Sequence, residues 1–194
     1  GKAGGIKIVN DLKSLETEAK SLLGKKLITH QTGPSGRIVK RLYVEVSSNI
    51  DKEFYLSCVV DRASSKIAFI SSDQGGMDIE EVAIKSPEKI LTTKVDLDSK
   101  ISDEDCNKII SVFNLDAETK EQGISLIKSI YKLFIETDAN LIEINPLILT
   151  KEKELICLDA KINFDGNALF RHPELIELRD LNDCLLYTSP SPRD

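Results

Sequence analysis

Residues 141–162 read LIEINPLILTKEKELICLDAKI, which is two Ile- and Leu-rich segments separated by the charged sequence KEKE. Apolar segments of this length on either side of a charged turn predict a β-hairpin. Four polar residues interrupt the apolar segments: Glu143, Asn145, Asp159 and Lys161. If the turn is centred on Glu152, antiparallel pairing places Asn145 opposite Asp159. The same pairing places Glu143 opposite Lys161.

The predicted hairpin has one polar and one apolar face, because side chains alternate along a strand. The apolar face is expected to pack on a core and carries Ile142, Ile144, Ile148, Ile156, Leu158 and Ile162. The polar face also carries Leu141, Leu147, Leu155 and Cys157, so its carboxylates are expected to be partly buried. A partly buried carboxylate is costly unless a partner satisfies it. Mg²⁺ is one such partner, since it takes oxygen ligands.

An ordinary structural hairpin explains the same spacing equally well. Cross-strand polar pairs are common, and Lys161 can pair with Glu143 instead of reaching a phosphate. A shift of the turn by one residue would also dissolve the arrangement. The residues of the hairpin therefore leave a metal site and a structural role both open.

The composition excludes several classes of protein. The 194 residues carry a net charge of −6, which disfavours a nucleic-acid partner because a phosphate backbone requires a basic face. No apolar run reaches the ~18–20 residues of a membrane span. The four Cys have no metal or disulfide spacing, and Cys58, Cys106 and Cys157 are expected to be small core residues. A reducing, cytoplasm-like compartment is expected.

The pattern of apolar residues predicts an α+β fold, because strands and helices mix without strict βαβ alternation. Strands are expected over residues 5–9, at the start of 27–37, and over 41–46, 54–61 and 66–72, the last two forming a hairpin. Helices are expected to begin at Asn10 or Asp11, near Ile79, at Ser102 and at Asp116. Ser102 with Asp105 resembles a capping box.

The remaining motifs give weaker signals. The Gly-rich stretches GKAGG (1–5) and SSDQGG (71–76) can bind an anion through backbone N–H groups, but a plain turn is the favoured reading of each. The two histidines, His30 and His172, are expected in loops, without a carboxylate motif to orient either imidazole. No catalytic triad or zinc site is predicted.

Both ends of the chain are unusual. It begins at Gly1 without an initiator Met, so the N-terminus is expected to be truncated. The last residues, CLLYTSPSPRD, turn abruptly to Ser and Pro and resemble the translation of a sequencing adapter. Residues 184–194 are therefore predicted to be a non-native, disordered tail, and residues 1–183 a single partial domain.

Several motifs in order resemble the β subunits of the ADP-forming succinate–CoA ligase family. They are GKAGG, THQTGP, VDRASSKIAFISSDQGGMDIEEVA, LIEINPLILT and LDAKINFDGNALFRHPELIELRD, spread over residues 1–183. The resemblance implies an ATP-grasp fold without the family's C-terminal CoA-ligase domain. It implies a citric acid cycle enzyme that converts succinate, CoA and ATP to succinyl-CoA, ADP and phosphate. The route runs through a phosphohistidine on the α subunit of a heterotetramer.

The resemblance also assigns roles to residues of this chain. Asn145 and Asp159 match the Mg²⁺ ligands, and Glu143 matches a catalytic glutamate that faces the phosphohistidine. The residues that match ATP-binding positions are Gly1, Glu45, Ser48 and Glu53. Asp73 and Gln74 depart from the Thr-Glu usual in the family, and the family's lysine before the Gly-rich loop and its C-terminal succinate contacts are absent.

Two rival functions remain at this point. One is a related ATP-grasp ligase, such as a malate–CoA ligase or a GTP-forming β subunit, which a substrate panel would distinguish. The other is a non-catalytic α+β module, which would be indifferent to Mg²⁺. The fragment by itself is expected to be inactive. The resemblance implies a cytoplasmic protein in a bacterium, or a mitochondrial matrix protein in a eukaryote, with neither nucleic acid nor membrane as partner.

Overall fold

The computed structural model describes residues 5–28, 33–97 and 100–178. Gly1, His30 and the predicted tail 184–194 lie outside these ranges. The chain forms two compact units, Gly1–Ser48 and Asn49–Asp194, and each is described here by itself. Of the helices in the described ranges, none combines the length and apolar character that a bilayer crossing requires.

The first unit contains one helix and one short pair of strands. Helix α1 (Leu12–Leu22) begins where predicted, because the Asp11 side chain accepts a hydrogen bond from the Ser14 amide. Strands β1 (Lys26–Leu27) and β2 (Arg37–Ile38) pair antiparallel. The strands predicted over residues 5–9 and 41–46 are wrong, since neither segment pairs with a strand in the described chain. Their apolar side chains are mostly exposed, and an apolar pattern does not make a strand without a partner.

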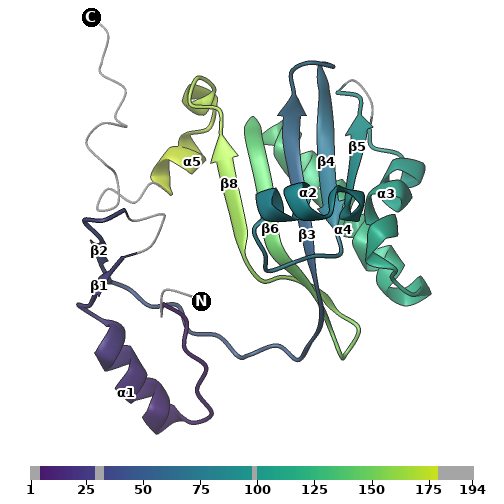
Figure 1. The fold of residues 1–194 in the computed structure, drawn as a ribbon. Coiled ribbons are helices and arrows are strands. Elements are labelled where there is room, and N and C mark those ends of the chain that lie inside the picture. Colours follow the sequence, from purple (N-terminus) through teal and green to yellow (C-terminus); the bar gives the residue numbers. More distant parts are fainter. Residues whose placement is uncertain (1–4, 29–32, 98–99, 179–194) are drawn as a thin grey trace, which may run out of the picture. The chain divides into compact units, whose positions relative to one another are not determined.

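The second unit is built on a six-stranded antiparallel sheet in the order β5-β4-β3-β6-β7, with β8 also paired to β6 (Figure 1). Its strands are β3 (Ile50–Asp61), β4 (Lys66–Ser72), β5 (Ile90–Val95), β6 (Ala139–Thr150), β7 (Leu155–Cys157) and β8 (Ala160–Phe164). The predicted hairpin of β3 and β4 is confirmed, with Asp61 opposite Lys66. Strand β6 lies beside β3, so the stretch that opened the sequence analysis occupies the middle of the sheet.

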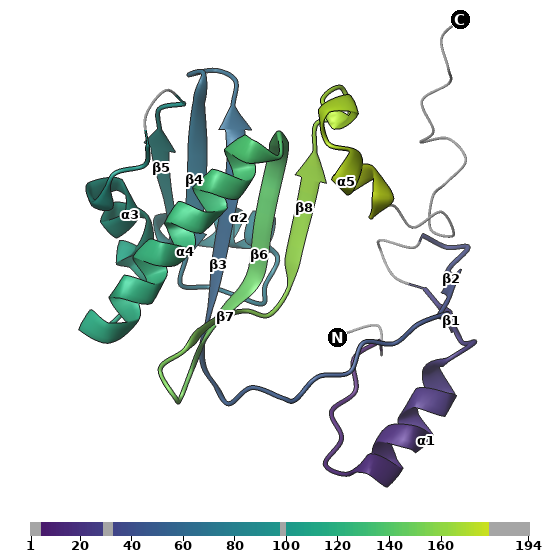
Figure 2. The ribbon, with the colours of Figure 1, turned by 180° about the vertical axis from the view of Figure 1, so that it is seen from behind.

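Helices cover both faces of this sheet. The long helix α4 (Ala117–Glu136) crosses one face with α3 (Asp103–Ile110), as Figure 2 shows from behind. The short helix α2 (Ile79–Lys85) lies in front of the opposite face in Figure 1. Single 3₁₀ turns occupy Pro87–Lys89, Ser111–Phe113 and Leu169–Arg171, and α5 (Pro173–Glu177) follows the last of them. The mixed arrangement confirms the predicted α+β class.

The core lies between the sheet and α3 and α4. Its largest fully buried side chains include Phe54, Phe69, Phe113, Ile109 and Ile127. The predicted helix starts are confirmed, since Ser102 Oγ accepts from the Asp105 amide at 3.0 Å and Asp116 accepts from the Thr119 amide at 3.0 Å. Cys58 and Cys106 are core residues as predicted, whereas Cys157 is exposed because β7 pairs only with β6 and lies at the edge of the sheet.

The register predicted for the hairpin is confirmed. Glu143 lies opposite Lys161, and Leu147 lies opposite Cys157. Between these pairs the Asn145 amide donates to the Asp159 carbonyl at 3.2 Å. The turn is therefore centred on Glu152, and the polar residues of the two arms meet.

The strict alternation predicted along β6 is wrong beyond Asn145. Leu147, expected on the polar face, joins the core, as do Leu149, Ile142 and Ile144. The cause is a β-bulge, because the pairing with β3 shifts by one residue between Phe54 and Leu56. The bulge falls at Asn145 and Pro146, which are joined by a cis peptide bond. Along β6, odd-numbered residues therefore point to one face of the sheet before the bulge and to the other face after it.

The loop Asp73–Asp78, here called the Gly-Gly loop, packs closely against β3. The Gly75 amide donates to the Glu53 carbonyl at 3.1 Å. A Cβ added at Gly75 would lie 2.3 Å from the Phe54 nitrogen and 2.5 Å from the Glu53 carbonyl carbon. These are backbone atoms of a central strand and cannot move aside, so glycine is required for the close approach.

We expect Gly75→Ala to lower the free energy of unfolding by about 1–3 kcal/mol, because the new methyl group overpacks the strand. Gly166→Ala is the matched control, since a Cβ there meets no atom within 4 Å. Urea unfolding of both variants measures the difference. Equal stability of the two would contradict the close packing of the loop.

Candidate functional site

Asn145 fastens the Gly-Gly loop to the hairpin. Its side-chain Oδ1 accepts a hydrogen bond from the Gly76 amide at 2.8 Å. Its Nδ2 donates to the Met77 carbonyl at 2.9 Å. The two segments are almost 70 residues apart in the sequence, and their contact could not be read from spacing. The residue predicted as a metal ligand therefore also anchors a loop.

Glu53 lies beside the same loop. A Cβ added at Gly76 would stand 2.3 Å from Glu53 Oε2, and Gly76 has a positive φ of 67°, so glycine is favoured there on both counts. Glu53 is exposed near the start of β3, where the Gly75 amide of the Gly-Gly loop donates to its carbonyl. The structure thus brings Glu53, predicted to bind nucleotide, and Asn145, predicted to bind metal, to the same loop.

Asp159 lies directly across from Asn145, in the break between β7 and β8. Its side chain is exposed, and it forms no hydrogen bond or ion pair with any residue that the structure describes. Asn145 Oδ1 has a second lone pair beyond the one used by Gly76. These oxygen donors fit Mg²⁺, which commonly takes one or two protein oxygens and completes its shell with water and phosphate.

No group of three or more His, Cys, Asp or Glu side chains with metal-binding geometry occurs within residues 5–28, 33–97 and 100–178. The pair of Asp159 and Asn145 suits only a cation that brings most of its own ligands.

Glu143 is half-buried and faces two neighbouring strands. It lies opposite Lys161 on β8 and opposite Ser57 on β3. In the described structure no ion pair within 4.0 Å joins Glu143 to Lys161. The cross-strand salt bridge that the sequence left open is therefore not formed, and the Glu143 carboxylate is not neutralised by its strand partner.

The other residues predicted to contact the nucleotide do not belong to the second unit. Glu45 and Ser48 belong to the first unit, where Glu45 is exposed and Ser48 half-buried in a segment without helix or strand. Gly1 lies outside the described residues. The roles of these three residues stay predictions.

The prediction that His172 has no orienting carboxylate is wrong. His172 Nε2 lies 2.7 Å from Asp138 Oδ2, and Nδ1 lies 3.3 Å from Glu174 Oε1. Asp138 stands 34 positions away and meets His172 because Ala139 at the start of β6 pairs with Phe164 at the end of β8. An ionised carboxylate only accepts, so Nε2 carries the proton in the bond to Asp138.

His172 lies far along β6 from Asn145, one of the two residues predicted to bind metal. Asp138 precedes β6 by one residue, and Asn145 follows seven residues later, roughly 20 Å along the strand. Arg171 also pairs with Asp138 at 2.8 Å. The hydrogen bond from His172 and the charge of Arg171 hold the pKa of Asp138 below its usual value. The cluster ties the segment after β8 to the turn before β6.

The Asp73–Gln74 pair, which departs from the resemblance, is ordered by side-chain contacts. Gln74 Nε2 donates to Asp73 Oδ1 at 2.9 Å, and Lys89 Nζ lies 3.1 Å from Asp73 Oδ2. The hydrogen bond from Gln74, followed by the contact with Lys89, lowers the pKa of Asp73. Asp73 is therefore ionised at neutral pH and holds the first residues of the Gly-Gly loop.

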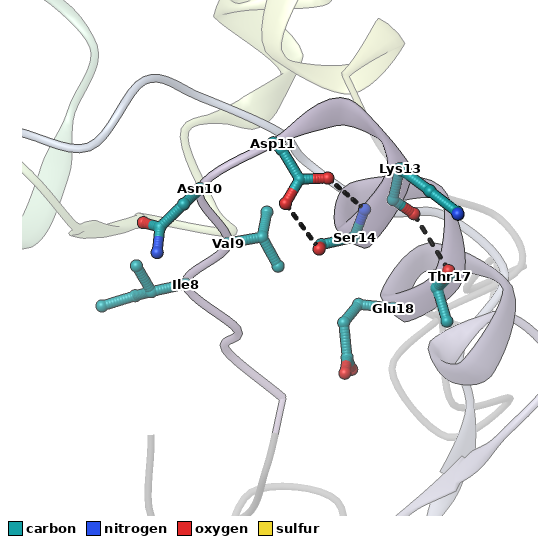
Figure 3. A pocket seen from close by; sticks show the side chains of 8 residues that line it. All are labelled: Ile8, Val9, Asn10, Asp11, Lys13, Ser14, Thr17 and Glu18. Carbon is teal, nitrogen blue, oxygen red and sulfur yellow. Dashed lines mark hydrogen bonds between the residues drawn. The ribbon is translucent and has the colours of Figure 1, made fainter.

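The first unit contains a hollow of about 450 Å³ at the start of α1 (Figure 3). Its lining comes from residues 8–18 and includes none of the predicted site residues. Figure 3 shows the Asp11 carboxylate hydrogen-bonded to the amide and hydroxyl of Ser14. Because the Asp11 carboxylate already caps the N-terminus of α1, this helix N-terminus does not suit a phosphate.

Curated relatives match most of this chain. It is 72% identical over 183 residues to a protein named succinate–CoA ligase [ADP-forming] subunit beta from Pelagibacter ubique (strain HTCC1062). The proteins of the same name from Parvibaculum lavamentivorans and Staphylococcus haemolyticus are 52% and 49% identical. Each match covers 94% of this chain and 47% of the relative, so the chain spans about half the length of the curated relatives it matches.

Solved structures support the fold. The chain resembles ATP citrate lyase from Methanothrix soehngenii, solved with citrate and coenzyme A, with a TM-score of 0.61 at 14% identity. That likeness covers 96% of this chain and 41% of the lyase chain, and at this identity it concerns the fold alone. The sequence pattern of the ATP-grasp domain family matches residues 1–149, which confirms the predicted fold, and the chain therefore belongs to the ATP-grasp family.

Proposed function

We propose that this chain is the nucleotide- and Mg²⁺-binding part of the β subunit of an ADP-forming succinate–CoA ligase of the citric acid cycle. The observation that carries the proposal is the 72% identity over 183 residues to a protein of that name. The loop-and-hairpin site supports it, because the Asp159 carboxylate pairs with no described residue and lies across from the Asn145 amide, which the Gly-Gly loop fixes. The partner is an α subunit, and the small substrates are ATP, succinate and CoA.

The proposed first step transfers the γ-phosphoryl group of ATP to a histidine of the α subunit. A bond forms between an imidazole nitrogen and phosphorus, the bond from phosphorus to the β–γ bridging oxygen breaks, and ADP leaves. The phosphoryl group then serves to activate succinate for thioester formation with CoA, with release of phosphate. Catalysis of such a transfer rests on positioning and on offsetting charge rather than on covalent chemistry of the protein.

Asp159 and Asn145 would hold Mg²⁺, which when bound offsets negative charge on the phosphate oxygens. Asn145 also keeps the Gly-Gly loop against the hairpin, so that the amides of the loop and the carboxylate of Asp159 stay in one place. Glu53 fixes the other side of the loop and supplies a contact for the nucleotide.

Glu143 would orient the incoming imidazole. A carboxylate that accepts from one imidazole N–H favours the tautomer whose other nitrogen attacks phosphorus. The absence of an ion pair with Lys161 leaves Glu143 available for this contact. His172 does not suit the role of acceptor, because both its ring nitrogens face carboxylates.

We expect Asp159→Asn in a full-length β chain to lower Mg-ATP-dependent phosphorylation at least ~100-fold, since metal ions contribute several kcal/mol to such transfers. Folding should be unaffected because Asp159 is exposed. Transfer of radiolabel from ATP measures the phosphorylation rate, electron paramagnetic resonance of bound Mn²⁺ measures metal binding, and thermal unfolding measures stability. Glu104→Gln on α3 is the control for loss of one charge. A near wild-type rate for Asp159→Asn would overturn the metal assignment.

Asn145→Ala should weaken Mn²⁺ binding less than Asp159→Asn does, because a neutral amide contributes less than a carboxylate. It should lower the free energy of unfolding more, by about 1–3 kcal/mol, since two hydrogen bonds to the Gly-Gly loop are lost. Mn²⁺ titration should therefore show the larger loss for Asp159→Asn, and urea unfolding the larger loss for Asn145→Ala. The same ranking in both assays would show that Asn145 has only one of the two roles.

The route through the α subunit predicts where the phosphate goes. Radiolabelled ATP should place acid-labile label on α and none on the β chain. Glu143→Gln should slow this labelling about tenfold or more without lowering the unfolding temperature. Succinate and malate are then compared as acceptors in the complete reaction, and ATP and GTP as donors. Label on the β chain in the absence of α would refute transfer between subunits.

A further inference from the structure

Ser57 is a buried hydroxyl without a partner in the described structure. It is only 2% exposed, and its Oγ makes no hydrogen bond. A buried polar atom left in this state costs about 1–3 kcal/mol. Ser57 lies on β3 directly opposite Glu143 on β6, so both side chains point to the same face of the sheet.

Tyr55 is the next residue of β3 on that face. Its ring is 4% exposed, although it carries a polar hydroxyl. Burial raises the pKa of Tyr55, the nearby Ser57 hydroxyl lowers it, and the carboxylates of Glu143 and Glu80 raise it further. Tyr55 therefore keeps its proton at neutral pH and remains a hydrogen-bond donor near two carboxylates.

Ser57 and Tyr55 thus lie on the same sheet face as Glu143, and in the described structure no ion pair within 4.0 Å joins Glu143 to Lys161. We propose that Ser57 and Tyr55 are positioning residues. They hold the Glu143 carboxylate in the orientation needed to accept a hydrogen bond from the imidazole N–H of the α-subunit histidine. The inference rests on the proposed role of Glu143 in transfer to the α subunit. Because Cβ atoms of directly opposed residues are about 4.5–5.5 Å apart, the Ser57 hydroxyl is within the reach of the Glu143 side chain.

The chemical reason is that the two oxygens of the Glu143 carboxylate accept from different donors. An oxygen held by hydroxyl donors of β3 leaves the second oxygen to accept from the imidazole N–H. Hydroxyls suit this better than Lys161 would, because a lysine would neutralise the charge that stabilises the imidazole proton. The hydroxyls fix the direction of the carboxylate and leave its charge in place.

The test uses the reconstituted enzyme of full-length β chain and α subunit, with radiolabelled ATP as substrate. Ser57→Ala and Tyr55→Phe should each slow labelling of α by about tenfold, as expected for loss of a hydrogen bond to a charged group. The KM for ATP should not change. In a Glu143→Gln background neither substitution should slow labelling further, because both act through Glu143.

Three variants separate positioning from a structural effect. Ser57→Thr keeps the hydroxyl and should retain a near wild-type rate. Thr93→Val removes another buried hydroxyl that lacks a partner, on β5, and should not change the rate. Tyr131→Phe removes a phenol that donates to the Asp96 carbonyl at 3.1 Å, and should likewise leave the rate unchanged.

Each outcome is decisive. Equal slowing by Ser57→Ala in the wild-type and Glu143→Gln backgrounds would overturn the positioning role, as would unchanged rates for both Ser57→Ala and Tyr55→Phe. If Glu143→Gln itself leaves labelling of α intact, the role of Glu143 fails and the inference fails with it, while transfer to α stands. If wild-type enzyme places no label on α, the proposed function is wrong, and this inference with it.

Discussion

The contact on which the site depends is the side-chain amide of Asn145 bound to the Gly-Gly loop. One amide uses its oxygen for Gly76 and its nitrogen for Met77, so it holds the loop to β6, while the Gly75 amide holds the same loop to the Glu53 carbonyl of β3. Because Asn145 sits at the bulge in β6, the loop, β3 and both arms of the hairpin are fixed by one residue. Glu53, Asn145 and Asp159 keep their places through this arrangement.

Much of this could be read from the sequence because it follows from local rules. The hairpin register depends only on where the turn is centred, and the KEKE sequence located it correctly. The helix starts at Asp11, Ser102 and Asp116 follow from short side chains that accept from nearby amides. The strands expected over residues 5–9 and 41–46 did not follow, since a strand requires a partner and neither segment has one in the described residues.

Features that depend on tertiary contact could not be predicted in this way. Asp138 meets His172 only because β6 pairs with β8, and no spacing in the sequence signals that meeting. The bulge at Asn145 changed the side of Leu147 and Leu149, and Pro146 was the one local sign of it. The absence of an ion pair between Glu143 and Lys161 depends on side-chain rotamers, which a register does not determine.

The partnerless carboxylate of Asp159 has a consequence for the order of binding under the proposed function. Glu53 and Asp159 stand beside Asn145 with no described cation paired to either, so the local potential there is negative. A nucleotide without its metal would carry its own negative charge into this field and be repelled. Binding should therefore favour ATP that arrives already complexed with its cation, and the concentration of free nucleotide alone should be a poor guide to occupancy.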